Sequence, residues 1–109
     1  MNHSLLDAII DVANVGDNQI VAGQVGKVIK VANFNFIVAG SVNVKWKSGA
    51  ATPKTGAYPL AAQCGLAPST QSPDFLFKCA VGQDLILNLS AGVQCSGSVA
   101  YWFEQTAAP

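Results

Sequence analysis

Charged side chains are scarce in this sequence, and arginine is missing altogether. Charged residues make up 11% of the 109 residues, and six lysines balance six acids to a formal net charge of zero. Nucleic-acid-binding proteins present a basic surface and favour arginine, whose guanidinium matches phosphate geometry. We therefore expect no nucleic-acid partner. Near-neutral surfaces promote association, which favours a protein covered inside an assembly over one with a merely polar, uncharged surface.

Residue types that support catalysis or metal binding are also few. His3 is the only histidine, and Cys64, Cys79 and Cys95 are an odd number without Cys-x-x-Cys spacing. A catalytic triad needs a histidine or an equivalent base, and zinc needs about four clustered ligands. We expect no enzyme activity, no metal and no cofactor. The cysteines are interpreted as buried free thiols, with a Cys79–Cys95 bridge as the alternative.

No signal peptide or membrane span is indicated. The N-terminal stretch MNHSLLDAIIDVANVGDN lacks a basic start, and Asp7 and Asp11 interrupt its apolar residues. No stretch approaches the ~18 uncharged apolar residues of a membrane helix. We expect synthesis in a cytoplasm, unless the protein leaves as part of something larger, and no membrane partner.

The sequence has stretches in which apolar and polar residues alternate. In SVNVKWKSGA (41–50), Val42, Val44 and Trp46 share one side and Asn43, Lys45 and Lys47 the other, the pattern of a β-strand with one buried face. Residues 26–40 alternate too, but the parity of Ile29 and Val31 is opposite to that of Phe34 and Phe36. A bulge or bend near Ala32 would reconcile the halves, and residues 28–47 are expected to form a hairpin.

The rest of the chain fits the same class. Residues 48–74 hold four of the five prolines and are expected to be a long loop region, with Tyr58, Leu60 and Leu66 directed into the core. Further strands are expected over 75–81, 85–90 and 98–105. The sequence predicts an all-β fold: an antiparallel two-sheet sandwich, jelly-roll-like, of about seven or eight short strands. We assign residues 1–15 to an N-terminal arm and residues 16–109 to a single sandwich domain.

Two features are candidates for an interaction surface. Residues 4–12 are expected to be an extended arm or edge strand, with a one-turn helix as the alternative, and Leu5, Leu6, Ile9 and Ile10 are its large apolar residues. Trp102 has the outward parity of its strand. Either the second face of its sheet is covered, or Trp102 is exposed at a subunit contact or a sugar-stacking platform.

Several stretches resemble a family of short tailed-bacteriophage proteins. They are GDNQIVAGQVGKVIKV, VAGSVNVKWKSGA, TGAYPLAAQCGLAPS and AVGQDLILNLSAGVQCSGSVAYWF, and the resemblance extends from Gly16 to about Tyr101. The cysteines and the NHSLLDAIID segment depart from the family pattern. The shared motifs are structural, so they specify a fold better than an activity.

The resemblance implies a non-enzymatic virion structural protein. Small all-β phage proteins of this type often serve as capsid cement or decoration. It would be made in the host cytoplasm, sit on the capsid surface, form a homo-trimer and bridge subunits of the major capsid protein. Residues 1–15 are a candidate strand donor to a neighbour's open sheet edge. The alternative is a carbohydrate- or receptor-binding module of a tail or head fibre.

Overall fold

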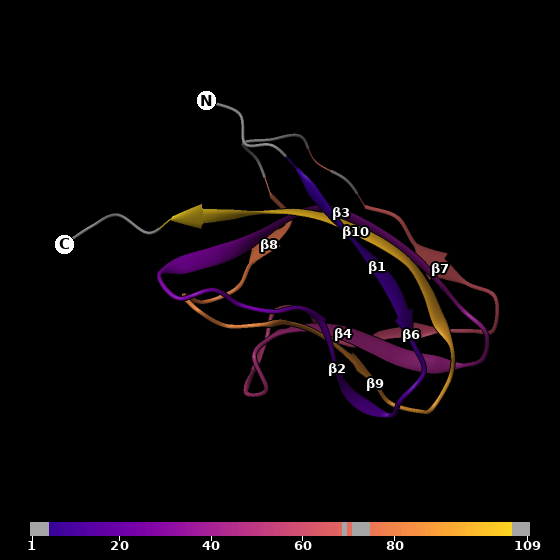
Figure 1. Cartoon of the computed structure of the whole chain (residues 1–109). Helices are drawn as coiled ribbons and strands as arrows, with labels where there is room; N and C mark the ends of the chain where they lie inside the picture. The colour runs from indigo at the N-terminus through magenta and orange to yellow at the C-terminus, as the bar shows by residue number, and fades with distance from the viewer. Residues whose placement is uncertain (1–4, 69, 71–74, 106–109) are drawn as a thin grey trace.

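The computed structural model describes residues 5–68, 70 and 75–105. These residues form ten β-strands and no helix, arranged as two packed antiparallel sheets (Figure 1). The strands are β1 (Leu6–Val12), β2 (Gly16–Val21), β3 (Lys27–Val38), β4 (Val42–Ser48), β5 (Thr52–Pro53), β6 (Tyr58–Leu60), β7 (Gly65–Leu66), β8 (Phe77–Lys78), β9 (Leu85–Leu89) and β10 (Cys95–Gln105). The predicted two-sheet sandwich is confirmed. The strand count exceeds the expected seven or eight because four strands have only two or three residues.

The chain passes repeatedly from one sheet to the other. Sheet A has the order β1-β10-β3, and the free edge of β3 pairs with both β7 and β8; sheet B has the order β2-β9-β4, and the free edge of β4 pairs with both β5 and β6. All pairings are antiparallel. This wrapping, with the first and last strands adjacent in one sheet, is a jelly-roll arrangement. It leaves β1 and β2 as the edge strands on one side of the sandwich (Figure 1).

The parity change in β3 is produced by a bulge at Ala32. In the β10–β3 pairing Ala100 lies opposite Asn33 and Tyr101 opposite Val31, so Ala32 has no opposite residue. The extra residue shifts the alternation by one, so the apolar side chains before and after Ala32 both face the core. The bulge predicted near Ala32 is confirmed.

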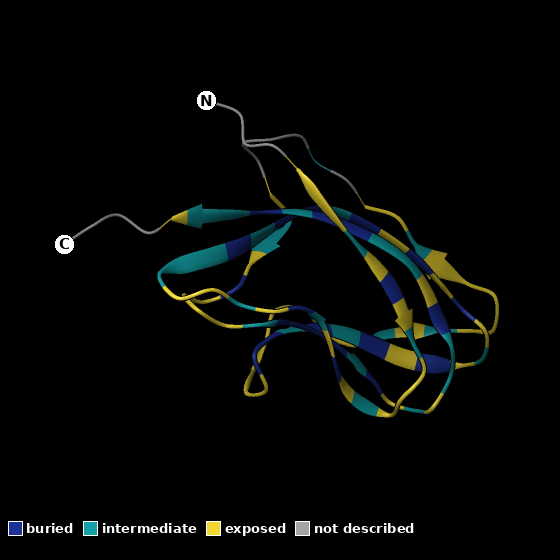
Figure 2. Cartoon of the chain, in the orientation of Figure 1, coloured by how far each residue is buried: buried dark blue, intermediate teal, exposed yellow. Residues whose placement is uncertain are grey.

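The core lies between the sheets and contains one of the two tryptophans. Trp46 and Val44 are fully buried, as their parity predicted. The Trp46 ring contacts the Phe34 ring edge-to-face at a centroid distance of 5.2 Å and lies 5.8 Å from Phe77. Buried and exposed residues alternate along the long strands (Figure 2). Aromatic and branched side chains from both layers therefore hold the sandwich together.

Several sequence expectations were wrong in detail. Residues 28–47 are not a hairpin, because β3 belongs to sheet A and β4 to sheet B. Gly16-Asp17-Asn18, residue types typical of a turn, are the start of β2. Of the strand expected over 75–81 only Phe77–Lys78 is a strand. The strand expected over 98–105 begins earlier, at Cys95. Alternation specifies which face a residue occupies but not which strand lies beside it.

The N-terminal segment forms a strand and not a helix. Residues 6–12 pair in continuous register with β10, from Leu6 opposite Tyr101 to Val12 opposite Cys95. Even-numbered residues face the core, as the strand interpretation required, and Ile10 is only 1% exposed. Residues 1–4, including His3, lie outside the described residues.

Candidate functional site

No group of three His, Cys, Asp or Glu side chains within the described residues is placed to hold a metal ion. Among the same residues, no helix is long and apolar enough to cross a membrane. The surface carries exposed apolar residues, hollows and charges, and these are the candidates for a site.

All three cysteines are free thiols, and two are buried. Cys79 and Cys95 are buried and unbridged, whereas Cys64 is exposed. Burial raises the pKa of both Cys79 and Cys95 to about 11, so both are protonated near neutral pH. A protonated thiol is a poor nucleophile and metal ligand. The interpretation of these two as hydrophobic core residues agrees with the structure, and the alternative Cys79–Cys95 bridge is absent.

The predicted interface residues of the N-terminal segment divide by parity. Ile9 is 80% exposed on β1, and Leu5 and Leu6 are 44% and 45% exposed. Ile10 is buried in the core, so its side chain is not available to a partner in this conformation. Residues Leu5, Asp7, Ile9 and Asp11 are all exposed and have the same outward parity; we call these four residues the β1 strip. Asp7 and Asp11 were missed as interface candidates, although the alternation that identified Ile9 also includes them.

Trp102 is outward-facing yet buried. Its neighbours Tyr101 and Phe103 lie opposite Val31 and Ile29 and pack against the core, whereas Trp102 lies opposite Lys30 on the outer face of sheet A. It is nevertheless only 1% exposed. Of the two interpretations, the covered second face is correct, and Trp102 does not offer an exposed stacking platform.

The outer face of sheet A at its other end carries short polar side chains. Asn35 Nδ2 donates to Ser98 Oγ at 3.1 Å, and Gln94 Nε2 donates to Asp11 Oδ1 at 2.6 Å and to Ser96 Oγ at 3.0 Å. The Asn35–Ser98 bond joins two strands, and the Gln94 amide links Asp11 of β1 to Ser96 of β10. The side chains at this end of the face are therefore polar, and the Asp11 carboxylate is the charged group among them.

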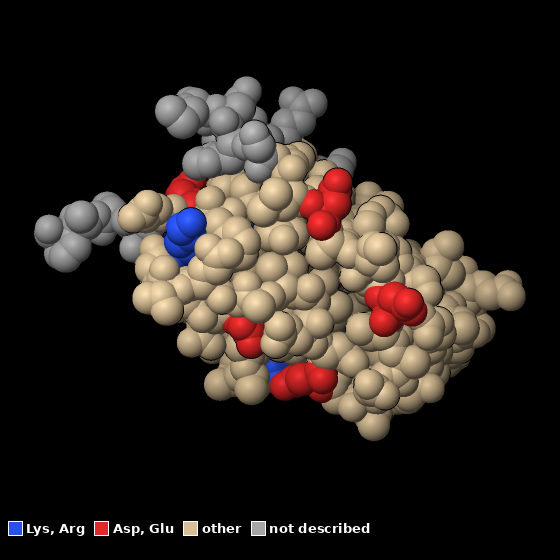
Figure 3. Space-filling model, viewed as in Figure 1, with Lys and Arg blue, Asp and Glu red and all other residues tan. Residues whose placement is uncertain are grey.

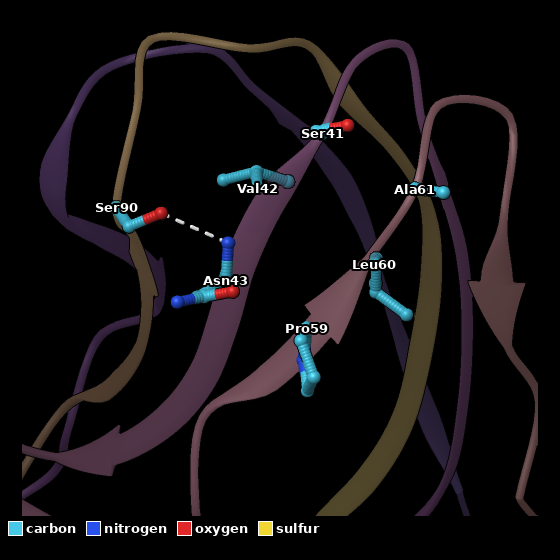
Figure 4. Close-up of a pocket in the computed structure, with 7 residues that line it drawn as sticks. All are labelled: Ser41, Val42, Asn43, Pro59, Leu60, Ala61 and Ser90. Atoms are coloured by element: carbon cyan, nitrogen blue, oxygen red, sulfur yellow. Dashed lines mark hydrogen bonds between the residues drawn. The ribbon is translucent and has the colours of Figure 1, made fainter.

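The larger surface hollow lies on the outer side of sheet B. It has a volume of about 450 Å³ and is lined by Ser41, Val42, Asn43, Pro59, Leu60, Ala61 and Ser90 (Figure 4). The Asn43 backbone N–H donates to Ser90 Oγ at 2.8 Å, so this hydroxyl already has a partner. None of the lining side chains is ionisable. The hollow can accept a small apolar or amide group, but it contains no group able to transfer a proton.

Each of the two described ion pairs joins strands of one sheet: Lys30 and Glu104 lie on the neighbouring strands β3 and β10, whereas Lys47 of β4 reaches Asp17 of β2 across β9. Lys47 Nζ lies 3.0 Å from Asp17 Oδ1 on sheet B, and Lys30 Nζ lies 2.6 Å from Glu104 Oε2 on sheet A. The Asp17 carboxylate also accepts a 2.7 Å hydrogen bond from Asn88 Nδ2. This bond first, and then the bond from Lys47, lowers the pKa of Asp17 below its ordinary value of 3.8. Both pairs hold strands together; neither has the geometry of a reactive site.

No protein-family model matches the sequence, and no curated protein is significantly similar to it. The β1 strip, on the open edge of a rigid sandwich, is therefore the strongest candidate for a functional surface.

Proposed function

We propose that this chain is a non-enzymatic virion structural protein: a cement or decoration protein on the outside of a bacteriophage capsid. It would act as a homo-trimer that bridges neighbouring subunits of the major capsid protein. The sequence resemblance to short tailed-phage proteins supplies the phage assignment. The sandwich supplies a suitable scaffold, since such a role needs a rigid body and contact surfaces and no reaction.

The observation that carries this proposal is the position of Ile9. A β-branched side chain that is 80% exposed lies on an edge strand whose outer edge has no strand partner among the described residues. Natural proteins protect such edges with charged side chains, especially lysine, and with proline or bulges; β1 has no lysine, proline or bulge, and its only charges are Asp7 and Asp11. An open edge strand with an exposed isoleucine between two acids is suited to contact with a protein surface that carries lysine.

The donor role of residues 1–15 takes a more limited form in this fold. Because β1 pairs with β10 of its own chain and places Ile10 in the core, removing the segment would damage folding as well as contacts. The outer side of β1 remains open to a neighbour while its inner side stays in the sandwich. Point substitutions of outward residues therefore test the contact better than a deletion.

The test is sedimentation with expanded capsids of the phage that encodes the chain. We expect the purified protein to pellet with the capsids at a saturating ratio and to raise their resistance to heat. Ile9→Asp should reduce this binding, whereas Val25→Asp, a control at a residue 99% exposed in the loop after β2, should not. Protein that remains in the supernatant and has the mass of a monomer would contradict the proposal.

The alternative of a carbohydrate- or receptor-binding module has less support. It requires Trp102 to be exposed as a stacking surface, but Trp102 is buried. Tyr58 is half-buried against the core. Binding on a glycan array would favour this alternative over the cement role.

A further inference from the structure

The charges of this neutral protein are separated across the sandwich. Among the described residues, every acid on a strand lies on β1, β2 or β10, and every lysine lies on β3, β4, β8 or directly after β5. The strand acids are Asp7, Asp11, Asp17 and Glu104, and the lysines are Lys27, Lys30, Lys45, Lys47, Lys54 and Lys78; the remaining described acid, Asp84, lies directly before β9. Because β1 is an edge strand on one side and β5 and β8 pair at the opposite side, Asp7 and Asp11 lie at one edge of the sandwich and Lys54 and Lys78 at the other.

The side of the molecule with β1 in front carries carboxylates on an otherwise mostly uncharged surface, with little lysine in view (Figure 3). Asp17 and Glu104 are matched by lysines across their own sheets. Asp7 and Asp11 have no ion-pair partner among the described residues, and neither do Lys54 and Lys78 at the other side. Lys27, Lys45 and Asp84 also have no ion-pair partner among the described residues. The unpaired charges on β1 are therefore acidic, and those at the β5–β8 edge are mostly basic.

The β1 strip combines these acids with apolar side chains. Asp7 and Asp11 flank Ile9, and residues two apart on one face of a strand lie about 6.6 Å from each other. The opposite side has the same combination with the other sign. Exposed Lys78 lies opposite Lys30 of β3, and Lys30 Nζ lies 4.6 Å from the centroid of the Phe75 ring. Phe75 and Val81 are 38% and 50% exposed.

Lys54 belongs to the same side: the Ala80 N–H, shortly after β8, donates to Ser48 Oγ at 2.8 Å, and Ser48 lies opposite Thr52, two residues before Lys54. Lys54 and Asp84 both act on the Cys79 thiol, so this side carries one acid beside its two lysines. We call Lys54, Lys78, Phe75 and Val81 the lysine side. The β1 strip and the lysine side thus match in both charge sign and apolar content.

We propose that copies of this chain associate side to side, with the β1 strip of one copy against the lysine side of the next. The partner is a second copy because one molecule carries both complementary surfaces. This inference rests on the homo-oligomer in the proposed function and specifies the contact between its subunits. It does not depend on binding to a capsid.

A symmetric pairing of two β1 strands is disfavoured by the same residues. An antiparallel two-fold centred on Ile9 would place Asp7 of each copy opposite Asp11 of the other, and like charges directly opposite each other destabilise a strand pair. The contact is therefore between unlike surfaces. Such a contact closes into a ring when its rotation allows, and otherwise grows as a filament. A ring of three is the closed form that agrees with the proposed trimer.

Charge reversal tests the contact without any capsid. One variant carries Asp7→Lys and Asp11→Lys, and a second carries Lys54→Glu and Lys78→Glu. A control places new lysines on exposed loops with Val25→Lys and Ala62→Lys. Circular dichroism and thermal unfolding establish that each variant folds, and sedimentation velocity measures mass.

We expect the parent protein and the control to be oligomeric at low salt and to dissociate at about 1 M salt, where the screening length is about 3 Å. Each reversal variant alone should associate at least tenfold more weakly, because attraction becomes repulsion. An equimolar mixture of the two should associate again. In the mixture, each attractive contact joins one chain of each variant. The two variants must therefore alternate around a ring, and a closed ring contains an even number of chains.

A parent protein that is monomeric at low salt would overturn the inference, as would a folded reversal variant with the mass of the parent or a mixture that stays monomeric. Capsid binding is measured separately. A monomer that still pellets with capsids would contradict this inference and leave the cement role intact. An oligomer that dissociates in salt but does not bind capsids would support this inference and contradict the cement role.

Discussion

Ile10 of β1 lies directly opposite Gly97 of β10, and Gly97 in turn lies opposite Phe36 of β3. Two large core side chains thus flank a residue without a side chain. Ile10 and Phe36 are 1% and 2% exposed, so the N-terminal strand contributes to the core although it lies at the edge of sheet A.

Replacing Ile10 should therefore weaken the fold, whereas replacing its neighbour should not. Ile10→Ala removes fully buried methyl and methylene groups, and we expect a loss of about 2–5 kcal/mol in the free energy of unfolding. The matched control Ile9→Ala alters an exposed side chain and should change stability by less than about 0.5 kcal/mol. Urea unfolding followed by tryptophan fluorescence measures both. Equal effects would contradict the assigned orientation of β1.

Gly97 is expected to tolerate no side chain. A Cβ atom at this position would lie 2.7 Å from the Asn35 carbonyl carbon and 2.7 Å from the Phe36 Cα, both backbone atoms. Gly97→Ala should cost about 1–3 kcal/mol, since the two strands must move apart. Gly56→Ala is the control, because a Cβ there meets nothing within 4 Å. Thermal denaturation of the pair measures the difference, and an unchanged melting temperature for Gly97→Ala would contradict the close approach of β10 and β3.

Asn18 stabilises the connection between β1 and β2. Its side-chain amide donates to the carbonyl oxygens of Asn14 at 2.9 Å, Gly16 at 3.2 Å and Leu87 at 3.3 Å. Asn18→Leu keeps the volume but leaves these acceptors without their donor, so stability should fall by about 1–3 kcal/mol. Gln19→Leu, at the exposed next position, is the control for added hydrophobicity. Hydrogen exchange should show faster exchange in β2 for Asn18→Leu only.

Acid should weaken sheet B at its surface. The hydrogen bonds from Asn88 and Lys47 lower the pKa of Asp17 below 3.8, so the ionised carboxylate stabilises the fold. That contribution is complete above the ordinary pKa and is lost as the pH falls through the lowered one. The Asp17 carboxylate lies at the surface, where water screens its charge, so the effect should be under about 1 kcal/mol. Asp17→Asn should be less sensitive than the parent to a change from pH 5 to pH 2 in urea titrations; an equal sensitivity would exclude Asp17 as a source.

Only one thiol should react in the native protein. Cys64 is exposed, whereas Cys79 and Cys95 are buried and burial raises the pKa of each to about 11. Alkylation with iodoacetamide at pH 8, followed by mass spectrometry, should give one modification in buffer and three in denaturant. Cys64→Ser should abolish the native modification. Rapid native labelling of Cys79 would contradict its place in the core.

The faces of the strands could be predicted from the sequence, and their partners could not. The alternation around Trp46 and the parity change at Ala32 are local signals, and both match the structure. The assignment of β3 and β4 to different sheets is not local. It depends on β10, which lies between β1 and β3, and on β9, which lies between β2 and β4. A short connection at Gly40-Ser41 is equally compatible with a hairpin and with a crossing between layers.

The candidate surface was found only in part for a similar reason. Ile9 was identified from its apolar character, but its acidic neighbours gain meaning only when β1 is known to be an edge and the lysines are known to lie on the far side. Trp102 illustrates the opposite limit. Its outward parity was correct, yet its burial depends on what covers sheet A, which strand periodicity does not contain.

The pairing of the first strand with the last also determines when the molecule can be completed. A ribosome releases β1 early, but β10 emerges only after almost all of the chain has been made. Until then β1 lacks the strand with which it pairs, and completing sheet A waits for the closure of a loop that spans nearly the whole chain. Nascent chains on neighbouring ribosomes would expose this segment together before either could bury Ile10.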